Sequence, residues 1–74
     1  MTKTEEKIVN WVVVCVNEFA YYFSFDVKTA FKHLYNYGGI DFLNEYYEIE
    51  HTLSFDEIIE DLRLICKNNG GELS

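Results

Sequence analysis

Histidine and cysteine are the side chains in this sequence best suited to chemistry at neutral pH, and each occurs twice. His51 stands out because it adjoins Thr52 and lies close in sequence to Tyr47, Asp56 and Glu57. A histidine oriented by a carboxylate could act as a general base. No nucleophile, glycine-rich phosphate loop or close metal-ligand pair accompanies it. We therefore predict a structural histidine that packs beneath its loop and bonds the backbone or Asp56, and we expect neither a catalytic residue nor an enzyme.

The two cysteines are predicted to be buried, reduced thiols. Cys15 and Cys66 both fall on apolar helical faces, where a free cysteine packs as a small hydrophobe. A disulfide between them is the alternative, and it would require an oxidising compartment. Cys15, His33, His51 and Cys66 are each separated by fifteen or more residues, so they do not form the close ligand pairs of a zinc site. We therefore predict no metal and no cofactor.

Negative charge dominates the composition, with 13 Asp and Glu against 6 Lys and Arg and a net charge of −7. Lys and Arg are absent between Leu34 and Leu62. The acids of that stretch are Asp41, Glu45, Glu48, Glu50, Asp56, Glu57, Glu60 and Asp61. This balance disfavours direct binding to nucleic acids and to anionic membranes. It predicts either an ordinary solvated face or a surface that steers a basic protein partner.

Apolar residues recur at helical spacing in four segments. We predict helices over residues 5–23, 27–37 and 40–47, and a fourth from Ser54 to the stop at Asn68–Gly71. A strand is the alternative for the β-branched run within the first segment. Capping-box spacing favours the starts of the first and fourth helices. Asp26 is expected to cap the second helix, with Ser24 as the alternative, and Gly38–Gly39 is expected to end it. Residues 48–53 are predicted to form an extended loop.

The periodic positions also predict a core. In the second helix the apolar stripe is Val27, Ala30, Phe31 and Leu34, and in the loop Ile49 and Leu53 are expected to point inward. The fourth stripe is Phe55, Ile58, Ile59, Leu62, Ile65 and Cys66. Together the segments predict an all-α, small single-domain bundle of about four helices over residues 1–74. Its ordered core is expected over residues 5–69, with fraying from Glu72 to Ser74.

Membrane insertion is not expected from the sequence. The most apolar run, Trp11–Val16, is far shorter than the roughly 20 residues of a membrane-spanning helix. The residues before it are polar and acidic, unlike a secretory leader. We therefore expect a cytoplasmic protein with no membrane contact.

Some apolar residues lie outside the predicted core and are candidates for partner binding. Leu64 falls about half a turn from Leu62 and Cys66 on a helical wheel, so it is expected among the acids of its helix. The chain has more tyrosines than its core can bury, and this also favours partner binding because tyrosine is enriched at interfaces. The predicted partner-binding residues are Val14, Tyr21, Tyr46, Glu57, Glu60, Asp61 and Leu64.

Four ordered motifs between Trp11 and Leu62 suggest a family. They are WVVVCVNEF at 11–19, YGGIDFL at 37–43, YEIEHT at 47–52 and DEIIEDL at 56–62. Together they resemble a small bacterial family, the domain-of-unknown-function family thirty-seven ninety-one. The chain departs from that pattern at Gly39 and Glu50, where the resemblance leads us to expect apolar residues.

The resemblance implies little chemistry, because the family has no established activity. It implies short cytoplasmic proteins of bacteria and their mobile elements. Some are encoded beside proteins resembling ADP-ribosyltransferases, as a small neutraliser accompanies a toxin. The recurring residues, for which the resemblance implies a loop-pinning, structural role, are Tyr37, Gly38, Asp41, His51 and Thr52.

The combined expectation is a protein-interaction module that binds a partner protein with a basic surface, in the manner of an antitoxin-like neutraliser. One alternative is an acidic nucleic-acid mimic that inhibits a nuclease or a DNA-binding protein, encoded by a mobile element or phage. The other is a small ligand-binding protein or enzyme that uses His51. Self-association remains compatible with all three.

Overall fold

The protein folds as five helices with no strand among the residues that the structure, a computed structural model, describes (1–72). The helices are α1 (Lys3–Phe23), α2 (Val27–Asn36), α3 (Gly39–Glu45), α4 (Tyr47–Glu50) and α5 (Phe55–Asn68). The predicted all-α fold is confirmed, including a helical rather than extended Trp11–Val16. Ser74 lies outside the described residues, so the expected fraying at the C-terminus is described only as far as Glu72.

Side-chain caps begin three of the helices where the sequence predicts them. Thr2 and Glu5 form a reciprocal capping box on α1, with Oγ1 of Thr2 accepting from the Glu5 amide at 3.1 Å. Oδ1 of Asp26 accepts from the Thr29 amide at 2.7 Å, which begins α2. Oγ of Ser54 accepts from the amide of Glu57 at 3.2 Å at the start of α5. Because α1 begins at Lys3, its first turn is two residues earlier than predicted.

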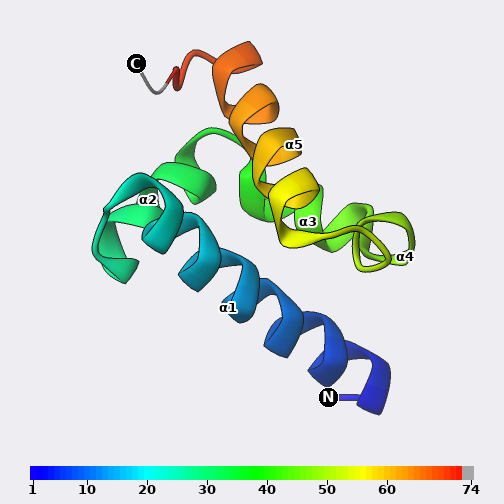
Figure 1. Ribbon diagram of the computed structural model, residues 1–74. Coiled ribbons are helices and arrows are strands. Elements are labelled where there is room, and N and C mark those ends of the chain that lie inside the picture. The colour runs from blue at the N-terminus through cyan, green and yellow to red at the C-terminus, as the bar shows by residue number, and fades with distance from the viewer. Residues whose placement is uncertain (73–74) are drawn as a thin grey trace.

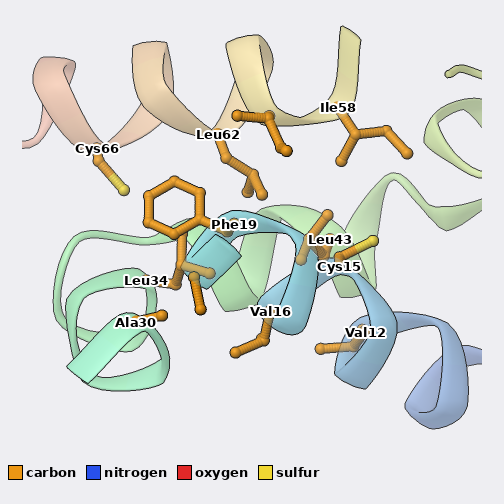
Figure 2. Packing of buried hydrophobic residues seen from close by; sticks show 12 residues of the cluster. Val12, Cys15, Val16, Phe19, Ala30, Leu34, Leu43, Ile58, Leu62 and Cys66 are labelled. Atoms are coloured by element: carbon orange, nitrogen blue, oxygen red, sulfur yellow. The ribbon is translucent and has the colours of Figure 1, made fainter. Parts of the chain in front are cut away.

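The long helix α1 forms the base on which the other helices pack (Figure 1). α1 contacts α2, α3 and α5, and α3 also contacts both α2 and α5. Figure 2 shows side chains of α5, including Leu62 and Cys66, pointing toward Phe19 of α1. The largest fully buried side chains are Cys15, Phe19, Leu34, Leu43, Ile58, Leu62 and Cys66. Removing the Phe19 ring would therefore cost about 3–5 kcal/mol of stability.

The turn between α2 and α3 depends on two glycines. Gly38 has a φ of 84°, in the left-handed region that favours glycine. At Gly39 a Cβ atom would lie 2.7 Å from Cδ2 of Leu34, so only glycine allows α3 to start against α2. The chain after α5 packs on the same turn, because Nδ2 of Asn69 donates to the Tyr37 carbonyl at 2.8 Å. The predicted role of Gly38–Gly39 in ending the second helix is confirmed.

The extended loop predicted over residues 48–53 is wrong. Residues Tyr47–Glu50 form the short helix α4, continued by the His51 amide donating to the Tyr47 carbonyl at 3.0 Å. Ile49, predicted to point inward, is 62% exposed, whereas Glu50 is only 5% exposed. Ile49 is exposed and Glu50 is buried because the helical turn directs residue 50, rather than residue 49, toward α5.

Val27 and Phe31 were predicted to lie in the core, and both are exposed. The buried face of α2 consists of Ala30 and Leu34. Phe55, at the start of α5, is exposed as well. The apolar stripe of α2 is wider than the surface that packs against it, so Val27 and Phe31 at its edge stay exposed. These two side chains line a groove that is described below.

Candidate functional site

The net negative charge of the chain comes from its second half. Residues 34–74 contain nine acids against Arg63 and Lys67 and account for the whole net charge of −7, whereas residues 1–33 hold four acids and four lysines. Within residues 1–72, ion pairs join Glu60 to Arg63 and Lys67 to Glu72. The remaining acids of α5 therefore have no cation beside them in the described part of the chain.

Two surface depressions on this half meet at Asp61. We call the first the acidic trough; it is lined by Leu53, Asp56, Glu57, Glu60 and Asp61. We call the second the Glu50 hollow; it has a volume of about 300 Å³ and is lined by Phe42, Glu50, Asp61, Leu64 and Ile65. Together they form the acidic face of the protein. α4 positions Glu50 where the chain passes from the end of α3 to the start of α5 (Figure 1).

Glu50 is a buried acid with an incomplete hydrogen-bond shell. Its Oε1 atom has no hydrogen-bond partner among the described residues. Burial, a hydrogen bond with Asp61 and repulsion from Asp61 and Glu57 raise the pKa of Glu50 to about 7. Near neutral pH Glu50 is therefore partly protonated, and its proton can be held in the hydrogen bond with Asp61.

The buried thiols are poor nucleophiles in this setting. Both cysteines are free and buried, as predicted. Burial, with added repulsion from Glu50 and Glu18, raises the pKa of Cys15 to about 12. Burial alone raises the pKa of Cys66 to about 11. Because the thiolate is the reactive form, these values favour a packing role for both cysteines.

Leu64 borders the Glu50 hollow and is 41% exposed, which agrees with its predicted position outside the core. Beside it, Arg63 donates from Nε to Oε2 of Glu60 at 3.0 Å, which lowers the pKa of that carboxyl. The structure thus brings together four predicted partner-binding residues of α5: Glu57, Glu60, Asp61 and Leu64.

The other predicted partner-binding residues lie elsewhere. Val14 and Tyr21 are exposed on α1 and line neither depression. Tyr46 is exposed at the end of α3, and its ring packs on Phe42 at a centroid distance of 5.2 Å. Because Phe42 lines the Glu50 hollow, Tyr46 adjoins the acidic face and could extend it.

The residues of the resemblance motif divide between two places. Tyr37 and Gly38 contact the turn after α5, where Asn69 and Gly71 pack against them. His51 instead contacts Tyr47, and Oγ1 of Thr52 donates to the carbonyl of Ile49 at 2.7 Å. Asp41, also in the motif, is exposed in the first turn of α3. The motif thus stabilises two separate turns instead of pinning one loop.

His51 bonds to the backbone as predicted but is not packed beneath a loop. Its Nδ1 lies 2.6 Å from the Tyr47 carbonyl, and its ring stacks on the Tyr47 ring at a centroid distance of 4.4 Å. The side chain is exposed at the end of α4. It lines none of the depressions described here, so the geometry gives it a helix-ending role.

An apolar groove between α1 and α2 was missed by the sequence analysis. The α1–α2 groove has a volume of about 270 Å³ and is lined by Val12, Val13, Val16, Asn17, Val27, Lys28 and Phe31. Val27 and Phe31, assigned to the core from periodicity, form part of its wall. Glu50 was also missed as a site residue. The sequence feature that could have revealed Glu50 is the presence of an acid where the family resemblance leads us to expect an apolar residue.

Together these features define a small all-α protein with an acidic, partly apolar depression on one half. No single helix within residues 1–72 is long and apolar enough to cross a membrane. Taken together, α1 and α2 have sufficient length and apolar composition, but the two helices are bent by 107° relative to each other. The chain belongs to the family described as protein of unknown function (DUF3791), whose family model matches residues 10–69. This is the family that its ordered motifs resemble. No curated protein and no solved structure matches the chain.

Proposed function

We propose that this protein is a non-enzymatic interaction module that binds a partner protein with a basic surface through its acidic face. The observation that carries the proposal is the exposure of Leu64 at the edge of the Glu50 hollow, whose two carboxylates, Glu50 and Asp61, form no ion pair within residues 1–72. An apolar anchor surrounded by charge of one sign suits a partner that is steered electrostatically and held by desolvation. We further propose that binding occludes the partner, as an antitoxin-like neutraliser does.

The test is capture of a partner from native cytoplasm by the tagged protein, compared with its Leu64→Asp variant. Leu64 is 41% exposed, so the variant should fold with nearly unchanged stability and lose the partner. Val14→Asp is the matched control, because Val14 is 43% exposed and lies on α1, away from the acidic face. If Val14→Asp loses the partner and Leu64→Asp keeps it, the acidic face is not the interface. If the captured partner is an enzyme, stoichiometric protein should inhibit it.

The alternative is an acidic mimic that occupies a nucleic-acid-binding protein. It is favoured by Asp56 and Glu57, which line the acidic trough without an ion pair in residues 1–72. Salt separates the two proposals. A mimic should lose affinity steeply as ionic strength rises, whereas a contact anchored by Leu64 should persist after its charge steering is screened.

A further inference from the structure

The Glu50 hollow combines apolar walls with a carboxylate floor. Phe42, Leu64 and Ile65 contribute the walls. Glu50 lines it while remaining 5% exposed, and its Oε1 atom is without a partner in residues 1–72. Asp61, which is partly buried, supplies the second carboxylate. A buried acceptor with no donor is a costly feature unless something outside the chain satisfies it.

We propose that the Glu50 hollow receives one arginine side chain of the partner protein, whose guanidinium group binds between Glu50 and Asp61. The methylene stem of that arginine would pack against Leu64 and Ile65. Phe42 offers an aromatic surface to the cation. The inference rests on the proposed function and deepens it, because it specifies which chemical group of the basic partner the acidic face recognises.

The geometry favours arginine over other cations. A guanidinium presents five donors in a planar fork, which can satisfy two neighbouring carboxylates at once. A lysine ammonium is more strongly hydrated and loses more on entering a partly apolar hollow. Ca²⁺ takes more oxygen ligands than these two carboxylates supply, and Mg²⁺ keeps most of its water and gains little from apolar walls. The residues 1–72 contain no group of three or more metal-ligating side chains around it.

Arginine binding should release a proton. Before binding, Glu50 is partly protonated near neutral pH, and the groups beside it add no positive charge: Asp61 and Glu57 from α5, and Cys15 from α1. The guanidinium arrives fully charged and donates hydrogen bonds to both carboxylates. The proton of Glu50 then leaves to solvent, and the two carboxylates face one positive charge. Affinity should therefore rise with pH through the raised pKa of Glu50.

The first experiment uses NMR on the isotope-labelled protein with an acetylated, amidated pentapeptide that has one arginine between alanines. Matched peptides carry citrulline, which has a similar shape without charge, or lysine at the same position. The arginine peptide should shift the signals of residues lining the Glu50 hollow and lower the pKa of the Glu50 carboxyl by about one unit or more. Citrulline should do neither, and lysine should bind more weakly than arginine.

Variants test the same site with a matched control. Glu50→Gln keeps the shape of the side chain and should weaken the arginine peptide about tenfold or more. Asp61→Asn provides a second variant of the carboxylate pair with the same expectation. Glu48→Gln removes an exposed acid of the same helix and should leave binding nearly unchanged. Equal binding to all four proteins would overturn the proposal.

The remaining outcomes are also decisive. Equal shifts with citrulline, or equal shifts with MgCl₂ at matched ionic strength, would show that the hollow does not recognise a guanidinium. Concentration-dependent shifts without peptide that vanish in Arg63→Gln would identify a second copy as the occupant and exclude a foreign partner. If a captured partner is lost by Leu64→Asp but kept by Glu50→Gln and Asp61→Asn, the proposed function stands and the arginine site fails. If the peptide binds as expected but no partner is captured, the arginine site stands and the proposed function fails.

Discussion

The Glu50 hollow and the α1–α2 groove are similar in volume, at about 300 and 270 Å³, and opposite in chemistry. The groove is walled mainly by valines and Phe31, with Asn17 and Lys28 also lining it, so anything bound there would be held chiefly by apolar burial. The hollow adds two carboxylates, one of them buried, to its apolar walls. The hollow, unlike the groove, therefore presents carboxylates to a partner, and it should respond to pH near neutrality and to a cationic partner. Four predictions test this contrast.

The largest effect concerns stability and pH. The pKa of Glu50 is raised from 4.5 to about 7 in the folded protein. Below pH 4.5 the Glu50 carboxyl is protonated in both the folded and the unfolded chain, so it does not lower the free energy of unfolding. As pH rises toward 7, the unfolded chain releases a proton that the folded chain keeps, so stability falls by up to about 3 kcal/mol. Urea denaturation at several pH values measures this.

Glu50→Gln is the comparison for that measurement. The variant should lose most of this pH dependence and should be more stable than the parent protein above pH 7. All other side chains are the same in both proteins, so the difference between them isolates the contribution of Glu50. An unchanged slope of stability against pH in the variant would mean that Glu50 is not the group that couples folding to protons.

A smaller effect should appear at the thiols. Both should react slowly with a thiol reagent in the native state and quickly after denaturation, because burial raises the pKa of each. Glu50→Gln should lower the pKa of Cys15, which the Glu50 charge helps to raise, and speed its native labelling severalfold. Cys66 is the internal control, since burial alone raises its pKa. Equal acceleration of both thiols would indicate general loosening of the core.

Phe31→Asp tests the groove. Phe31 is exposed, so the variant should change the free energy of unfolding by no more than about 1 kcal/mol. It should also keep the partner that Leu64→Asp loses, because the groove lies outside the acidic face. Urea denaturation and partner capture measure the two expectations. Loss of the partner in a folded Phe31→Asp protein would move the interface to α1 and α2.

The smallest effect is expected for His51→Ala. The ring is exposed and its bond to the Tyr47 carbonyl is local, so stability should change by about 0.5 kcal/mol. Partner binding should also persist. A variant that melts like the parent protein but loses its biological effect would point to a functional histidine and revive the ligand-binding alternative.

The groove and the hollow also show where sequence analysis fails. Val27 and Phe31 have the spacing of core residues, but α2 is only ten residues long and its neighbours cover just Ala30 and Leu34. Glutamate is usually found at the surface, yet the helical turn between α3 and α5 directs Glu50 inward. In both cases the side chain's environment depends on how far a neighbouring helix extends, which periodicity within one segment does not record.

The sequence by itself determined four of the five helices, the side-chain caps of α1, α2 and α5, and most of the buried faces. Those features depend on residues three or four positions apart, as in the Thr2–Glu5 capping box, the Asp26 cap and the spacing of Ile58, Leu62 and Cys66. Only the tertiary structure decided that Glu50 is buried beside Asp61 and that Phe31 is not buried. The pairing of two acids eleven positions apart depends on the turn of α4 that brings Glu50 beside Asp61 of α5, and burial of a charge is an energy that only the assembled fold defines.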